Sequence, residues 1–120
     1  MKINILLPYK EKFDENKASS VSITVKNNLS HTKFLSHIKV YGKNVEKPLF
    51  KDNFEGIKYS IFSLKSKNAF LAYKMLKIMS KESSKKQLIE IHNRPYLVDQ
   101  IAKANNFPIT LFLHNDPQTM

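Results

Sequence analysis

Three short apolar runs separated by helix-like segments constrain the fold of this sequence more than any other feature. The runs are Lys2–Pro8, Gln87–His92 and Ile109–Leu113, and their apolar residues cluster together instead of alternating regularly with polar ones. Runs of this length and pattern are typical of parallel strands that are covered on both faces. The pattern therefore predicts an α/β domain built around a mainly parallel sheet.

Two more strands and three helices complete the predicted order. The further strands are expected at Phe34–Tyr41 and Ile57–Leu64. The expected helices cover Lys17–Ser30, a stretch from an N-cap at Asn68 to about Lys81, and a stretch from an N-cap at Asn93 through Pro95 to about Asn105. Right-handed crossovers then favour a Rossmann-like open sheet of about five strands in the order 3-2-1-4-5, with the first helix on one face and the others opposite. The sequence does not decide whether segment 43–56 forms a parallel crossover or a hairpin.

Length and composition indicate one soluble domain over residues 1–120. Hydrophobic residues make up 42% of the chain, which argues against disorder. There is no cysteine, so disulfides and thiolate metal sites are excluded, and a reducing compartment fits. The N-terminus has no signal-peptide pattern, and no apolar stretch approaches the ~20 residues of a membrane span. We therefore expect a cytoplasmic protein.

The net charge of +10 comes almost entirely from lysine, because Arg94 is the one arginine. Sequence-specific nucleic-acid readers and phosphate clamps favour arginine, whose planar fork binds two acceptors at once. A surface dominated by lysine suits anionic substrates or an anionic membrane surface, such as the inner face of a cell membrane. The plainer alternative is a solvated lysine-rich surface without a partner.

Candidate site residues follow from the rule that ligands of such sheets bind beyond the carboxyl ends of the strands, near the point where the strand order reverses. The residues placed there by the predicted strands are Tyr9, Lys10, His92, Asn93, Arg94, His114, Asn115 and Asp116. Arg94 is the most specific of them, since it adjoins a helix N-terminus, where free N–H groups attract anions.

Each candidate also has a purely structural interpretation. His92 can be a hydrogen-bonded histidine at a strand end, Asn93 a helix cap, and Asp116 with Pro117 part of a turn. A zinc site from His92, His114 and Asp116 is conceivable, but their spacing does not require it, and no metal is predicted. Gly42 and Gly56 are the only glycines. A glycine-rich pyrophosphate loop is therefore excluded, and no cofactor is predicted.

The strand ends also resemble a known family. The segments KINILLPY, LIEIHNRPYLVDQIAK and ITLFLHNDPQTM are similar to the first, fourth and fifth strand regions in the N-terminal domain of GT-B-fold glycosyltransferases. These belong to the large retaining group that includes sucrose synthase and many lipopolysaccharide and capsule enzymes. The resemblance implies a nucleotide-sugar-dependent transferase for cell-surface polysaccharide, acting on a glycan or lipid-linked acceptor without a metal.

The resemblance also implies roles for residues. His114 matches the histidine that faces the donor sugar, and His92, Asn93 and Arg94 match a loop lining the same cleft. The family's glycine pair after the first strand is replaced here by Glu15–Ser19, and its donor-binding second domain, with a paired-glutamate motif, is absent from residues 1–120. We therefore expect the N-terminal, acceptor-side part of a longer enzyme.

Two further expectations concern the chain on its own. It should transfer no sugar, and it should self-associate through the fifth-strand edge or through the sheet face that has one helix. The alternative function, from a different class, is a small basic α/β module that binds nucleic acid or an anionic surface.

Overall fold

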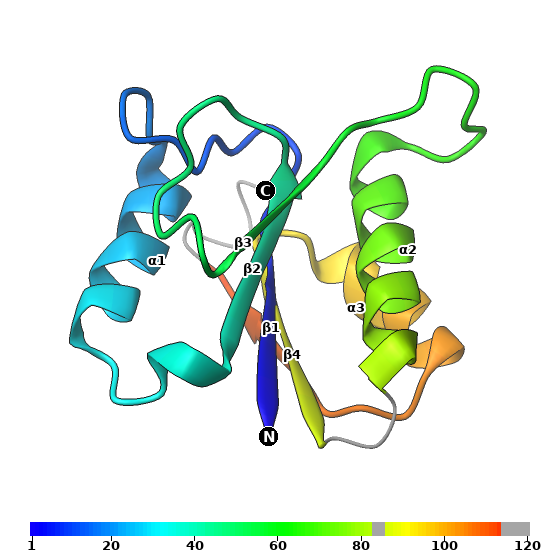
Figure 1. Ribbon diagram of the computed structural model, residues 1–120. Helices are drawn as coiled ribbons and strands as arrows, with labels where there is room; N and C mark the ends of the chain where they lie inside the picture. Colours follow the sequence, from blue (N-terminus) through cyan, green and yellow to red (C-terminus); the bar gives the residue numbers. More distant parts are fainter. Residues whose placement is uncertain (83–85, 114–120) are drawn as a thin grey trace.

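The protein is a parallel five-stranded sheet with helices on both faces, as the computed structural model shows for residues 1–82 and 86–113 (Figure 1). The strands lie in the order β3-β2-β1-β4-β5, so the predicted order is confirmed. The strands are β1 (Lys2–Leu6), β2 (Ile38–Lys43), β3 (Phe54–Ile57), β4 (Gln87–His92) and β5 (Ile109–Phe112). The α-helices are α1 (Ser20–His31), α2 (Lys67–Met79) and α3 (Pro95–Ala104).

The two sheet faces carry different layers, as predicted. Helices α2 and α3 cover one face, where Leu6, Met75, Ile91 and Leu97 belong to one buried cluster (Figure 1). Helix α1 covers the other face together with the loops that precede it and follow β2. The second buried cluster joins apolar residues of β1, β2, α1 and the first of these loops: Ile5, Leu7, Phe13, Val21, Val25, Leu29 and Val40.

A buried polar network ties three strands together on the α2 side. The Asn4 side chain donates to Gln87 Oε1 at 3.1 Å and accepts from the Tyr41 hydroxyl at 3.2 Å. Gln87 in turn donates to the Met79 carbonyl at 3.0 Å, at the end of α2. Burial, and then the nearby charges of Glu55 and Glu82, raise the pKa of Tyr41 well above its ordinary value, so its hydroxyl keeps the donated proton. Asn4 therefore places a buried, hydrogen-bonded polar side chain within the first apolar run.

The third strand differs most from its prediction. It is Phe54–Ile57, whereas the apolar pattern placed it at Ile57–Leu64. Its pairing with β2 ends at Lys43↔Ile57, because β2 itself ends there. The chain beyond Ile57 has no strand partner and crosses to the start of α2 as a loop (Figure 1). The pairing is parallel, so the connection between β2 and β3 is a crossover and not a hairpin.

Several boundaries also shift. Residues Leu35–His37 form a 3₁₀ turn, so the second strand begins at Ile38 and continues through Gly42, where it was expected to end. The N-caps are Ser66 and Arg94, not Asn68 and Asn93. Helix α1 starts at Ser20, three residues later than predicted, and α2 ends at Met79 before a 3₁₀ turn. These ends depend on individual hydrogen bonds that apolar periodicity does not reveal.

Among the described residues, no helix is both long and apolar enough to cross a membrane.

Candidate functional site

The carboxyl ends of β1 and β4 form the centre of the candidate site. The two strands are neighbours, with Leu6 paired to Ile91 in the last step of their register. The chain leaves β1 toward α1 on one face and leaves β4 toward α3 on the other (Figure 1). This divergence is the reversal point at which open α/β sheets bind ligands, and we call this edge of the sheet the crest.

The loop after β1 is fixed to the start of α2. The Tyr9 N–H donates to the side-chain oxygen of Asn68 at 2.7 Å. The Tyr9 ring meets the Tyr59 ring edge-on with centroids 6.1 Å apart, and Tyr59 meets Phe70 in the same way at 5.1 Å. Asn68 was expected to cap its own helix, but it holds the β1 loop instead. The result is an aromatic row between β1, the loop after β3, and α2.

Two lysine ammonium groups lie over the Tyr9 ring. Lys43, at the end of β2, is 5.2 Å from the ring centroid, and Lys67, in the first turn of α2, is 5.0 Å from it. Lys10 is exposed in the next position of the β1 loop. We call Tyr9, Lys10, Lys43 and Lys67 the lysine half of the crest. Such an arrangement concentrates positive potential beside an aromatic ring, next to the N–H groups that open α2.

Sequence reasoning found Tyr9 and Lys10 but missed Lys43 and Lys67. Lys43 was assigned to an irregular connection because the strand was expected to end at Gly42. Lys67 lies in the first turn of a helix whose N-cap was placed two residues later, at Asn68 instead of Ser66. No sequence motif marks these two lysines. They would have been found only if the end of β2 and the start of α2 had been predicted correctly.

The exit from β4 is buried and paired. His92 is 1% exposed, its Nε2 lies 2.7 Å from a carboxylate oxygen of Glu90, and its ring stacks on Phe112 with centroids 5.2 Å apart. Ile89 and Ile91 point to the α2 and α3 side, so strand alternation places Glu90 and His92 on the α1 side of the sheet. This arrangement agrees with the structural interpretation of His92 as a satisfied strand-end histidine.

Asn93 and Arg94 form the turn from β4 into α3. Asn93 is 5% exposed and has a φ of 55°, a left-handed conformation that asparagine tolerates better than most residues. Its N–H donates to the Phe112 carbonyl at 2.9 Å, and its own carbonyl accepts from the Arg94 guanidinium at 2.6 Å. Arg94 is the partly exposed residue of this turn. We call His92, Asn93 and Arg94 the β4 half of the crest.

The remaining candidates, His114, Asn115 and Asp116, lie outside the described residues. The expectation that His92 and His114 lie side by side at the same edge of the sheet therefore stays a prediction. Within residues 1–82 and 86–113 no three histidine, cysteine, aspartate or glutamate side chains gather as a metal site would require.

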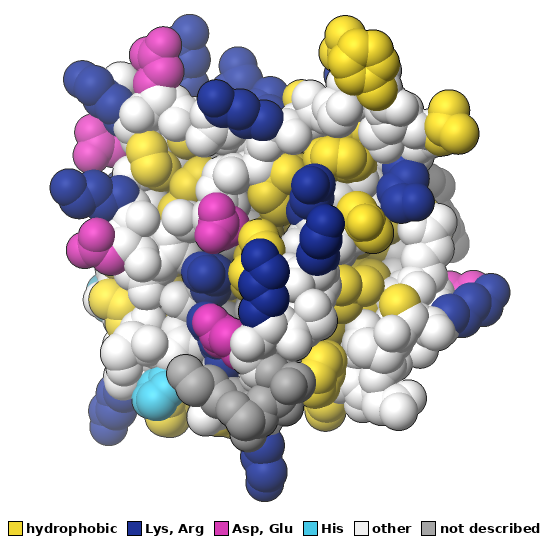
Figure 2. All heavy atoms as spheres, turned by 45° about the vertical axis from the view of Figure 1, so that its right-hand side comes forward, with side chains coloured by type: hydrophobic (Ala, Val, Ile, Leu, Met, Phe, Trp, Pro, Cys, Tyr) yellow, Lys and Arg dark blue, Asp and Glu magenta, His cyan; other side chains and the backbone are white. Residues whose placement is uncertain are grey.

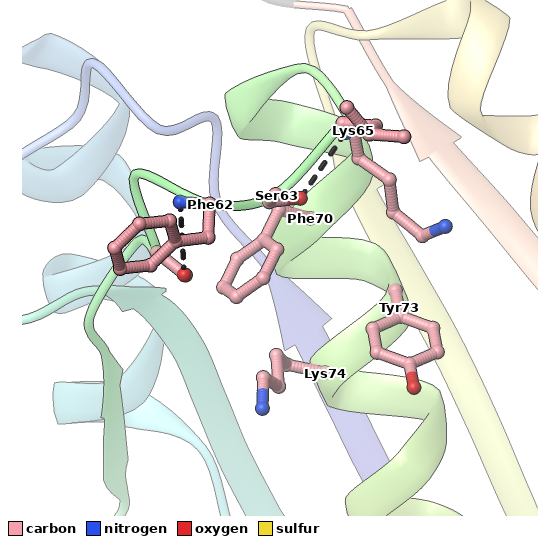
Figure 3. A pocket seen from close by; sticks show the side chains of 8 residues that line it. Phe62, Ser63, Lys65, Phe70, Tyr73 and Lys74 are labelled. Atoms are coloured by element: carbon pink, nitrogen blue, oxygen red, sulfur yellow. Dashed lines mark hydrogen bonds between the residues drawn. The ribbon is translucent and has the colours of Figure 1, made fainter.

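A hollow of about 520 Å³ lies beside the crest, where the loop between β3 and α2 folds back on the helix (Figure 3). Its lining combines aromatic and cationic side chains, including Phe62, Phe70, Tyr73, Lys65 and Lys74. Sequence analysis did not predict this hollow, because it assigned the loop to a strand.

Comparison with known proteins identifies no relative for this chain. No protein-family model, no curated protein and no solved structure matches it.

Proposed function

We propose that this chain is the N-terminal, acceptor-side part of a glycosyltransferase that moves a sugar from a nucleotide-sugar donor to a glycan or lipid-linked acceptor. The observation that carries the proposal is the convergence of two motif-bearing strand ends on one crest. The β1 loop with Tyr9 and the β4 turn with Arg94 were selected by the strand-end rule, and both lie in or next to segments that resemble the family. They leave adjacent parallel strands toward opposite faces. The Rossmann-like strand order is compatible with the proposal, although it was predicted from right-handed crossovers and not from the resemblance.

The charges along the crest suit this chemistry. Sugar transfer from a nucleoside-diphosphate sugar releases a nucleoside diphosphate, whose developing negative charge needs stabilisation by preorganised donors. Lys10, Lys43, Lys67 and Arg94 would supply positive potential along this edge, and the N–H groups at the start of α3 would add to it. By resemblance, His114 would orient the donor sugar. The donor itself would bind mainly to a second domain.

The test compares the 120-residue chain with a longer protein that contains it and a second α/β domain. We expect the longer protein to release a nucleoside diphosphate from a nucleotide-sugar in the presence of acceptor, and the chain alone to release none. Turnover by the chain alone would contradict the proposal. So would inactivity of a folded longer protein toward a broad panel of nucleotide-sugars and acceptors.

A variant of the longer protein tests the site. His114→Ala should lower turnover at least about 100-fold while leaving stability nearly unchanged, as removal of a group that contacts the reacting centre does. The matched control is His31→Ala, because His31 is exposed at the end of α1, away from the crest. An unchanged rate in His114→Ala would remove His114 from the site.

The net positive charge favours a second candidate, a small basic α/β module that binds nucleic acid or an anionic surface. The chain carries a net charge of +10. A module of this kind should bind RNA with an affinity that falls steeply as salt rises, because binding releases counterions. Two results together would favour this candidate: the chain binds RNA stoichiometrically, and the longer protein turns over no nucleotide-sugar.

A further inference from the structure

The loop between β3 and α2 exposes three large apolar side chains. Ile61 is 85% exposed, Phe62 is 87% exposed and Leu64 is 104% exposed, far above the other apolar residues of the described chain. Single exposed apolar residues are ordinary on protein surfaces, but adjacent ones indicate a surface that contacts something else. We call residues 58–66 the apolar loop.

The apolar loop is held in shape by its own hydrogen bonds. The Tyr59 hydroxyl donates to the Lys65 carbonyl at 2.7 Å and so closes the loop across its base. Two serines fold the intervening turns, since the Phe62 N–H donates to Ser60 Oγ at 3.2 Å and the Lys65 N–H donates to Ser63 Oγ at 3.1 Å (Figure 3). The apolar side chains are therefore presented outward by a structured turn.

The charged residues near these apolar side chains in the sequence are all cationic. The segment 57–81 contains six lysines and no aspartate or glutamate, and its lysines are Lys58, Lys65, Lys67, Lys74, Lys77 and Lys81. Lys65 Nζ lies 5.1 Å from the Tyr73 ring centroid, and Lys74 Nζ lies 5.5 Å from that of Phe70. Figure 2 shows lysine and arginine side chains interspersed with apolar ones over this side of the molecule.

We propose that the apolar loop docks this protein on anionic lipid bilayers, with Ile61, Phe62 and Leu64 entering the headgroup region and the surrounding lysines contacting anionic headgroups. Binding at the surface of a bilayer scales with buried apolar area together with attraction to anionic lipid, and the loop offers both in one place. The proposal does not depend on the proposed enzymatic function, because Ile61, Phe62, Leu64 and the tested lysines Lys58, Lys65 and Lys74 are not assigned to sugar transfer; Lys67 is the one lysine that both proposals share.

The charge and shape of the apolar loop favour an anionic bilayer over two other possible occupants, a second copy of the chain and RNA. A second copy docked by the same surface would set one lysine-rich segment against another, which is repulsive. RNA would satisfy the lysines but would leave the projecting aliphatic side chains of Ile61 and Leu64 without a favourable environment. An anionic bilayer satisfies both kinds of side chain at once.

The test measures co-sedimentation of the 120-residue chain with vesicles of phosphatidylcholine, alone or mixed with phosphatidylglycerol. We expect binding to the mixed vesicles, weak binding to pure phosphatidylcholine, and a loss of binding as salt rises. Equal binding to both kinds of vesicle, or no binding to either, would overturn the proposal.

Two variants and their matched controls localise the surface. We expect the variant with Ile61→Ser, Phe62→Ser and Leu64→Ser, and the variant with Lys58→Gln, Lys65→Gln and Lys74→Gln, each to partition at least about tenfold less onto mixed vesicles. The controls make the same kinds of change in α1 and in the loops on its side of the sheet: two apolar positions, Ile23→Ser and Phe34→Ser, for the first variant, and three lysines, Lys26→Gln, Lys33→Gln and Lys51→Gln, for the second. All these control positions are exposed, and they should bind like the parent chain.

The same variants identify the competing occupants. RNA binding that the lysine variant loses and the serine variant keeps, without vesicle binding by the parent, would make the surface a nucleic-acid site and overturn the proposal. A dimer of the parent chain that the serine variant dissociates, again without vesicle binding, would make the occupant a second copy. Because the substituted apolar side chains are exposed, the serine variant should keep the melting temperature of the parent, and this is measured alongside.

Discussion

The two halves of the crest lie on the same edge of one sheet but differ in how their side chains are held. In the β4 half, His92 and Asn93 are buried, and their partners are a carboxylate, an aromatic ring and main-chain groups. In the lysine half, the ammonium groups of Lys43 and Lys67 lie over an aromatic ring at the surface. The sequence motif that was easiest to find thus marks the half that is more deeply integrated in the fold.

The difference teaches what a strand-end motif can mean. The residues of a run such as His92–Pro95 can be required for the turn into a helix, whether or not they contact a ligand. Lys43 at the end of β2 and Lys67 at the start of α2 belong to no recognisable sequence motif. They nevertheless lie at the edge of the sheet where ligands of such folds bind. Substitutions should therefore affect mainly stability in the β4 half and mainly binding in the lysine half.

The largest effect on stability is expected for His92→Ala. The change removes the stack on Phe112, opens space at a buried position and deprives Glu90 of its imidazole partner. We expect the free energy of unfolding to fall by about 2–4 kcal/mol, as for other truncations of large buried side chains. Urea denaturation of the 120-residue chain measures this fall, and His31→Ala is the exposed control. A loss no larger than that of the control would show that the β4 half is not structurally locked.

A smaller effect is expected from the backbone of Asn93. Because its φ is 55°, Asn93→Ala places a side chain with a β-carbon in a left-handed conformation, whereas Asn93→Gly accepts that conformation freely. Both variants lose the same amide group, so their difference isolates the backbone contribution. We expect Asn93→Gly to be more stable than Asn93→Ala by about 1 kcal/mol in urea denaturation. Equal stabilities would mean that the turn relaxes to an ordinary conformation.

The smallest effect on stability is expected from the lysine half. The double variant Lys43→Gln and Lys67→Gln loses two surface cation–ring contacts but also removes two like charges that share the Tyr9 ring. These terms oppose each other, and we expect the free energy of unfolding to change by less than about 0.5 kcal/mol. Thermal unfolding at low and high salt measures it. A loss comparable to that of His92→Ala would erase the contrast between the two halves.

Much of the fold follows from the sequence because apolar pattern and crossover geometry act on whole segments. The strand Gln87–His92 was predicted with its observed ends, since turn residues bound it on both sides. The order of all five strands followed from right-handed crossovers and short connections. The distribution of the helices over the two faces followed from the same rule, and β5 lies at the edge of the described sheet as expected.

What failed depends on contacts that only the folded chain supplies. The apolar residues Ile61, Phe62 and Leu64 suggested a strand, but β2 is too short to pair with them. Asn68 suggested a helix cap, but its side chain is used by the Tyr9 N–H from a segment 59 residues away. Of the site, the crest and its β4 turn were predicted, while the cations from β2 and α2 were not. Self-association of the chain stays a prediction.

The central position of β1 has a consequence for the order of events during synthesis. β1 is made first, yet the Asn4 side chain meets its Leu88 carbonyl partner 84 residues further along the chain. At a translation rate of about 5–20 residues per second, the central strand waits roughly 4–17 s on the ribosome before β4 exists. During that interval its apolar run can pair with β2, but α3 follows β4 in the chain and is not yet made to complete the cover of that face. Until β4 pairs with it, the central strand presents an unpaired, apolar edge, which is the kind of surface that makes incomplete chains prone to aggregate.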